Sequence, residues 1–469
     1  MKEPRKPKTL GLLERKRLDR AERRRKKRIR ATIVISVLAV VGIAVSVQWR
    51  PWQNFSWGDL FRTKEEQPEK DDEQKEEGQT ANERQELIDA AEIMAASYGY
   101  DEAIEMLTSI EGYKKDREIQ NMIEDMEDEK ASCVPVNLDE VTHIFYQSLV
   151  VDEERAFANQ DNDPQAASNN QWMTTLDEFQ AITQEMYNRG YVLVSIHDLY
   201  EVTEGENGEE VWEPARLLLP EGKKAFVMSI DDVSYYHSYD GYGLASKLVL
   251  DENGDVMNEY VDAEGNTHIG AYDCISLLDQ FIKEHPDASY KGAKGIIALT
   301  GYNGILGYRT DVTYDLSHEN CDESQREWIK EHPEFDLETE RAEAKKIAEV
   351  LKENGWEFAN HTWGHIRVAD KSLESIRIDT EKWKENVEPL IGETDIIVFA
   401  HSQDIEDVGA YSASNEKYQY YREQGYQIFC NITSNNITNE DNHIWELISQ
   451  FNNKFFNLWN ITIRNIQSH

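Results

Sequence analysis

Two short motifs about 130 residues apart carry side chains that could bind a metal and catalyse hydrolysis. The first is Ser229-Ile-Asp-Asp-Val233 and the second is His361-Thr-Trp-Gly-His365. Two imidazole nitrogens and one carboxylate oxygen can hold Zn²⁺ or a similar divalent cation and leave positions open for water. The second carboxylate could then accept a proton from that water while the cation polarises a carbonyl group, which is the chemistry of amide or ester hydrolysis.

Both motifs follow apolar stretches that we expect to form β-strands, at residues 225–230 and 356–360. In folds that alternate strands and helices, active sites gather at the carboxyl ends of the strands. The spacing of four would let His361 and His365 face the same way if the segment turned helically. Acidic pairs and paired histidines also occur by chance, so the position of both motifs at strand ends carries the prediction.

The region around the motifs alternates between strand and helix patterns. We expect strands at residues 141–149, 191–196, 225–230, 295–300, 356–360, 395–399 and 426–431, and helices at residues 175–188, 270–285, 337–354, 372–391 and 416–423. Thr174 or Thr175 would cap the first of these helices, with Glu178 completing a capping box. Residues 251–266 are polar and rich in turn formers, which favours a surface hairpin or loop. The alternation predicts an α/β fold with a mostly parallel sheet, open or closed into a barrel.

The charge of the chain is divided unevenly between its first 30 residues and the rest. Residues 1–30 carry 15 Lys and Arg and 4 acids, a net charge of +11. The whole chain has 50 basic and 90 acidic residues, so the remainder has 35 basic and 86 acidic residues and a net charge of −51. A surface this acidic argues against nucleic acid as a partner, because binding to phosphates needs Lys and Arg.

An apolar run follows the basic segment. Residues 31–47 contain no charged side chain, and together with Gln48 and Trp49 they come close to spanning a hydrocarbon core of ~30 Å at ~1.5 Å per residue. We expect a single transmembrane helix at residues 31–49 in the cell membrane. The basic tail, residues 1–30, would be cytoplasmic and the rest of the chain extracellular. A cleaved signal peptide is the competing interpretation, although its apolar region would be shorter.

The segment between this run and the alternating region has two parts. Residues 50–82 are expected to form an acidic linker, because they are mostly charged and lack periodicity. Residues 83–130 carry apolar side chains at helical spacing, which predicts a short hairpin of helices that resembles a tetratricopeptide motif. A helical spacer is the plainer interpretation of this hairpin. Cysteines stand at positions 133, 274, 321 and 430, either as disulfides or as buried thiols.

The two motifs, their order and the strands before them resemble the polysaccharide deacetylase family, the NodB-homology domain. The stretches HIFYQSLV, MTTLDEFQ and NRGYVLVSIHDLYE also resemble the beginning of extracellular deacetylases. The resemblance covers roughly residues 136–432. It implies a distorted (β/α) barrel of the polysaccharide deacetylase type, preceded by the transmembrane helix and the helical hairpin.

Carried over residue by residue, the resemblance implies that Asp231 is the general base and that Asp232, His361 and His365 hold the metal. His401 would lie beside the site or simply fill space there. Members of the family remove acetyl groups from N-acetylglucosamine-type sugars or from O-acetylated polysaccharides. For a membrane-anchored extracellular domain, the expected substrate is peptidoglycan or another N-acetylglucosamine-containing cell-surface glycan.

This chain departs from the family pattern at three places. Val233 stands where the first motif usually ends in glycine, and the segment from Phe399 to Asp404 lacks the usual prolines. The late Leu-x-His of the family has no counterpart. Residues 433–469 are rich in asparagine, and we expect this atypical C-terminus to leave the barrel incomplete. A deacetylase fold without turnover, acting as a membrane-anchored glycan- or protein-binding module, is therefore the alternative function.

Overall fold

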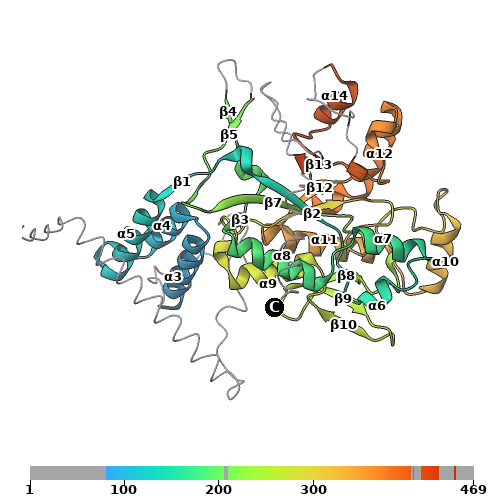
Figure 1. The fold of residues 1–469 in the computed structure, drawn as a ribbon, viewed down its shortest axis with the longest axis horizontal. Coiled ribbons are helices and arrows are strands. Elements are labelled where there is room, and N and C mark those ends of the chain that lie inside the picture. The colour runs from blue at the N-terminus through green and yellow to red at the C-terminus, as the bar shows by residue number, and fades with distance from the viewer. Residues whose placement is uncertain (1–80, 205–209, 403–404, 406–413, 433–447, 450–469) are drawn as a thin grey trace, which may run out of the picture. The chain divides into compact units, whose positions relative to one another are not determined.

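The computed structural model describes residues 81–204, 210–402, 405, 414–432 and 448–449 of the chain (Figure 1). This part has a mixed α/β fold around a parallel sheet that curls into a half-barrel, compatible with the expected (β/α) barrel. The expected basic tail, transmembrane helix and nearly all of the linker lie outside the described residues. Among the helices that are described, none has the length and apolar character needed to cross a bilayer.

The central sheet consists of eight short strands. They are β2 (Thr142–Tyr146), β3 (Tyr191–Leu193), β7 (Lys224–Asp231), β11 (Ile296–Leu299), β12 (Glu357–Asn360), β13 (Ile396–Val398), β14 (Ile428–Ile432) and β15 (Ile448–Ser449). The spatial order is β2-β7-β11-β12-β13-β14-β15, β3 also pairs with β7, and every pairing is parallel. The backbone of β15 lies beside β2, so the curled sheet returns toward its first strand. Residues 433–447 and 450–469 lie outside the described ranges, so the expectation of an incomplete barrel stays a prediction.

Helices connect and cover these strands. They are α6 (Glu153–Ala156), α7 (Pro164–Trp172), α8 (Leu176–Asn188), α9 (Cys274–Glu284), α10 (Glu323–Glu331), α11 (Leu337–Glu353), α12 (Leu373–Asn386), α13 (Glu388–Ile391) and α14 (Glu416–Glu423). The capping box expected at the start of α8 is present, with Thr175 as N-cap and Glu178 as its partner. The single helix expected at residues 372–391 is wrong. It is broken at Val387 between α12 and α13, because Pro389 in the first turn of α13 cannot continue the preceding helix.

Three smaller sheets lie outside the central one. Two are antiparallel pairs, β1 (Cys133–Pro135) with β6 (Leu218–Pro220) and β4 (Tyr200–Glu204) with β5 (Glu210–Pro214). The third is the antiparallel sheet of β8 (Ala245–Leu250), β9 (Val256–Val261) and β10 (Thr267–Gly270). It includes the polar segment 251–266, for which a surface hairpin or loop was expected, and the structure shows the hairpin. The four cysteines are free thiols.

The expected helical hairpin consists of α3 (Ala81–Ala96), α4 (Tyr100–Ser109) and α5 (Arg117–Ala131). It is bonded to the loop that follows α9. The Tyr98 hydroxyl donates to the carbonyl of Asp287 at 2.8 Å, and the Lys291 amide donates to the carbonyl of Ser97 at 2.7 Å. The Lys291 ammonium also forms a 2.6 Å ion pair with Glu102. These helices therefore pack directly on the α/β domain.

An aromatic core lies between the outer face of the sheet and helices α12 and α14. Its buried members include Ile397, Phe399, Tyr421 and Phe429. The neighbouring Trp383 of α12 is fully buried and donates its indole N–H to the carbonyl of Leu299 at 3.1 Å. Truncation of a buried tryptophan to alanine lowers the free energy of unfolding by about 3–5 kcal/mol. The burial of Trp383 and its hydrogen bond therefore hold α12 against β11.

His143 of β2 is a buried histidine without hydrogen-bond partners among the described residues. Its neighbours Ile144 and Tyr146 face α8 and α9. The side chains of a strand alternate, so His143 faces the inside of the curled sheet. Only 1% of the residue is exposed, and neither ring nitrogen has a partner within the described part. Burial lowers the pKa of this imidazole to about 4.

This lowered pKa predicts loss of stability in mild acid. An unfolded histidine has a pKa of about 6.5. As the pH falls from about 6.5 to 4, His143 is therefore protonated in the unfolded chain but not in the folded one, and this difference lowers the free energy of unfolding. His143→Leu should remove up to about 3 kcal/mol of this pH dependence of the free energy of unfolding. Urea unfolding of wild type and His143→Leu at pH values of about 7.0, 5.5 and 4.5 would measure how the free energy of unfolding depends on pH. Equal pH slopes in the two proteins would contradict the prediction.

Candidate metal centre

The register of three parallel strands brings the two motifs to one edge of the sheet. Asp231 at the end of β7 is level with Ala298 of β11, and Ala298 is level with Ala359 of β12. Residues that are level on neighbouring parallel strands point to the same face, and so do residues two apart on one strand. His361 is two residues beyond Ala359, and its amide continues the ladder to the Leu299 carbonyl at 2.9 Å. Asp231 and His361 are therefore on the same face.

Asp232 leaves the strand through an unusual backbone conformation. In a continued strand its side chain would point to the face opposite Asp231. Its φ of 60° lies in the left-handed region, which redirects the side chain. Non-glycine residues in this region cost of order 1–3 kcal/mol and persist where the surroundings enforce them, often at functional sites. The turn after β7 thus brings the Asp232 carboxylate toward the histidines.

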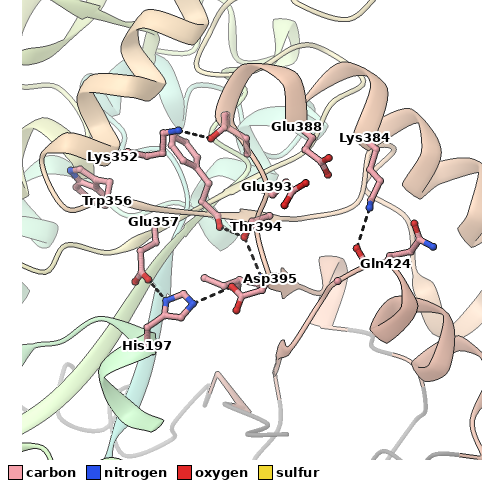
Figure 2. Close-up of a pocket in the computed structure, with 14 residues that line it drawn as sticks. His197, Lys352, Trp356, Glu357, Lys384, Glu388, Glu393, Thr394, Asp395 and Gln424 are labelled. Atoms are coloured by element: carbon pink, nitrogen blue, oxygen red, sulfur yellow. Dashed lines mark hydrogen bonds and ion pairs between the residues drawn. The ribbon is translucent and has the colours of Figure 1, made fainter. Parts of the chain in front are cut away.

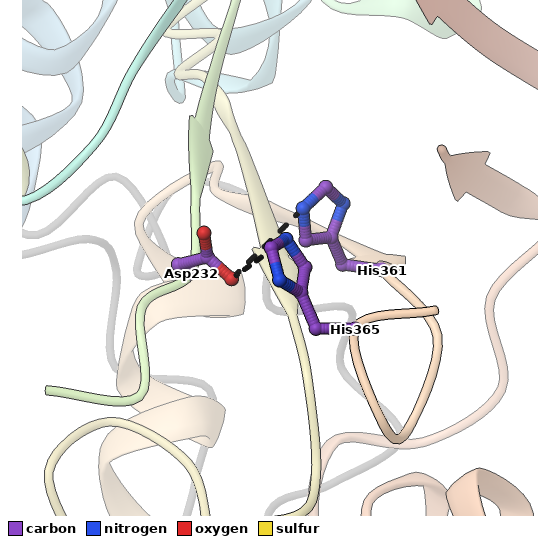
Figure 3. A group of neighbouring side chains, drawn as sticks. All are labelled: Asp232, His361 and His365. Atoms are coloured by element: carbon purple, nitrogen blue, oxygen red, sulfur yellow. Dashed lines mark ion pairs between the residues drawn. The ribbon is translucent and has the colours of Figure 1, made fainter. Parts of the chain in front are cut away.

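Asp232, His361 and His365 converge as the sequence predicted (Figure 3). Asp232 Oδ1 lies 3.6 Å from Nε2 of His365 and 4.0 Å from Nε2 of His361. One ligand atom from each residue lies within 4.8 Å of the other two. Two atoms bound to one Zn²⁺ at about 2.1 Å are at most about 4.2 Å apart, so the cluster needs only a small closure to hold the ion.

The hydrogen bond of His361 leaves Nε2 of its ring available to bind a metal. Nδ1 of His361 donates to the Val398 carbonyl at 2.7 Å, which directs the lone pair of Nε2 toward Asp232. Burial lowers the pKa of His365, and a neutral imidazole is the form that binds a metal. The chemistry of these donors therefore fits a divalent cation.

The segment from His361 to His365 forms a tight turn, so the condition of a helical turn, under which a spacing of four would align the two rings, is not met. Thr362 and His365 have φ values of 63° and 50°, outside the helical region. The Asn360 side chain accepts from the Thr362 amide at 2.6 Å, and the Thr362 hydroxyl accepts from the Ile366 amide at 2.8 Å. These local bonds stabilise a turn that a spacing of four residues does not reveal.

Asp231 is buried next to the cluster. It is 7% exposed and accepts a hydrogen bond from the Ser229 hydroxyl at 3.2 Å. Burial, and then the negative charge of Asp232, raises the pKa of Asp231 to about 8. A carboxyl group with a pKa near neutrality can exchange a proton at physiological pH.

His401 lies against the cluster from the end of β13. Its ring centre is 4.0 Å from that of His365, and its Nε2–H donates to the His365 carbonyl at 2.9 Å. The φ of His401 is 57°, so its backbone is left-handed like those of Asp232 and His365 at the same edge of the sheet. His401 therefore contacts the metal cluster through His365, as a neighbour of the candidate ligands.

Two residues that the sequence did not suggest support the turn after β7. Tyr236 donates its hydroxyl to Asp232 Oδ1 at 2.7 Å and lies 2.5 Å from the Thr300 hydroxyl. Arg309 is buried and donates to the carbonyls of Ser234 and Tyr235, at 3.2 and 2.7 Å. Tyr236 could have been suspected because it is four residues from Asp232, whereas no local pattern marks Arg309.

A pocket of about 540 Å³ lies at the opposite end of β12 (Figure 2). His197 stands at its edge, with Nδ1 bonded to Glu357 and Nε2 3.1 Å from Asp395. Burial opposes the charge of this ring, but the bonds to Asp395 and Glu357 outweigh it and raise the pKa of His197 to about 10. The ring separates the two carboxylates, so these residues do not converge as the triad does.

The chain was compared with protein families, curated proteins and solved structures. No protein-family model matches the chain, and no curated protein matches it. A solved structure of the Streptococcus pyogenes deacetylase PplD in complex with acetate is similar at 14% identity and a TM-score of 0.32. That match covers 64% of this chain and 84% of the PplD chain.

The convergence of the triad predicts the loss of metal binding in a single variant. His361→Ala removes one of three ligands, and we expect affinity for Zn²⁺ to fall at least about 100-fold, because three donors are the minimum of such a site. Titration of purified protein against a zinc-binding dye would measure the affinity. His197→Ala is the matched control, since it removes a histidine with two carboxylate neighbours that do not converge. Equal affinities in wild type and His361→Ala would contradict the assignment.

Proposed function

We propose that this chain is a metal-dependent hydrolase that removes acetyl groups from N-acetylated or O-acetylated cell-surface polysaccharide such as peptidoglycan. The observation that carries the proposal is the convergence of Asp232, His361 and His365, with the buried Asp231 adjacent in the chain. The polysaccharide substrate is supported by the resemblance of the two motifs to polysaccharide deacetylases. Attachment to the cell membrane through residues 31–49, with residues 83–432 outside the cell, belongs to the same proposal.

In this proposal three residues bind the metal and Asp231 transfers the proton. Asp232, His361 and His365 would hold a divalent cation, for which Zn²⁺ fits the two nitrogens and one oxygen. When bound, such a cation polarises the substrate carbonyl and makes a nearby water more acidic. His365 is the most exposed of the three, with 23% of its side chain accessible, so substrate would approach from its side.

Asp231 acts as the base in this proposal. It takes a proton from the attacking water as the new bond to the acetyl carbon forms. The protonated carboxyl group can return that proton to the sugar nitrogen or oxygen as the bond to the acetyl group breaks. One carboxyl group can perform both transfers, because the first transfer leaves it carrying the proton that the second one requires. The absence of the late family histidine from the sequence is consistent with this double role.

Asp231→Asn provides the test of the proposed reaction. The amide cannot accept the proton, so we expect kcat for acetate release to fall about 10²–10⁴-fold while Zn²⁺ affinity stays within about threefold. Acetate release from N-acetylated chitooligosaccharide and from peptidoglycan would be measured on zinc-loaded protein. Asp161→Asn, an exposed exchange of the same chemistry, is the control.

Two results would contradict the proposed reaction. A fully active Asp231→Asn variant would remove Asp231 from the chemistry. A wild-type protein that binds Zn²⁺ tightly but releases no acetate from any acetylated glycan would favour the alternative function, a module that binds glycan or protein without turnover.

A further inference from the structure

The histidine-bearing turn depends on a residue from a different element. Its backbone is left-handed at Thr362 and again at His365, so the two rings are aimed by backbone angles that the residues do not prefer. Bonds within the turn involve Asn360 and the Thr362 hydroxyl. The amides of Trp363 and Gly364, in the middle of the turn, have their partner on α12.

Asp379 of α12 supplies this partner. Its Oδ2 accepts from the Trp363 amide and its Oδ1 accepts from the Gly364 amide, both at 2.8 Å. Only 7% of Asp379 is exposed. A buried carboxylate is tolerated when it is hydrogen-bonded, so the carboxylate and the turn stabilise each other.

The contact is close on both sides. A Cβ atom on Gly364 would lie 3.1 Å from Asp379 Oδ1, so the glycine lets the carboxylate approach the backbone. On the helix side, Trp383 anchors α12 to the Leu299 carbonyl. The same carbonyl accepts from the His361 amide at 2.9 Å. Asp379 and His361 are therefore fixed to one point of β11.

We propose that Asp379 is a positioning residue for the cation site: its carboxylate fixes the turn and thereby the directions of the His361 and His365 rings before a cation binds. The proposal rests on the proposed function, because it assumes that these histidines bind a metal. Asp379 itself is not a ligand, since both of its oxygens are engaged by amides. Partners of this kind typically affect metal affinity 10–100-fold.

Asp379→Asn is the decisive variant, because it keeps the size of the side chain but places an NH₂ group against one of the two amides. We expect its Zn²⁺ affinity to fall about 10–100-fold in a dye-competition titration, with the far-ultraviolet circular dichroism unchanged. Asp370→Asn, an exposed exchange of the same chemistry near the same turn, should bind Zn²⁺ as the wild type does.

The outcomes are distinguishable. An Asp379→Asn protein that is folded and binds Zn²⁺ within about threefold of wild type would overturn the inference, since partners that position ligands matter by tenfold or more. If Asp379→Asn does not fold, Gly364→Ala tests the same contact more gently. Weakened Zn²⁺ binding in that variant would support the inference, and unchanged binding would overturn it. If the wild type binds no Zn²⁺, the proposed function itself fails, and the inference fails with it.

Discussion

Two carboxylates, Asp231 and Asp232, are buried side by side in the chain at the end of one strand. Negative charges so close together and away from water repel each other, and burial adds to the cost. The raised pKa of Asp231 is one response to this cost. The arrangement of Asp232 beside two imidazoles is the other, because a divalent cation held there would compensate the charge. The remaining features of the site serve to keep these groups together.

The frame of the site is the parallel pairing of β7, β11 and β12. Its register places Asp231 and Ala359 level with each other, so the two motifs meet although they are far apart in sequence. Buried charges then hold the turns that follow these strands. Arg309 binds carbonyl groups of the turn after β7, and Asp379 binds amide groups of the turn after β12. A cationic donor thus fixes the carbonyl groups of the first turn, and an anionic acceptor fixes the amide groups of the second.

Much of this frame could be predicted from the sequence, because apolar runs and caps are local signals. The strands before both motifs, the capping box at Thr175 and helix α14 were placed correctly. The backbone of the turns could not be predicted, since the left-handed residues depend on contacts from distant elements. Asp379 shows the reason: it is 14 residues beyond His365, and only the packing of α12 brings it to the turn. The break before Pro389, in contrast, had a local signal that the helical pattern outweighed.

The central claim is that Asp232, His361 and His365 bind one divalent cation. Anomalous X-ray diffraction from crystals grown with Zn²⁺, recorded on both sides of the zinc absorption edge, tests it most directly. The account predicts one strong peak about 2.0–2.2 Å from Oδ1 of Asp232 and from Nε2 of both histidines. A zinc peak bound by other residues, with no density between these three atoms, would contradict it.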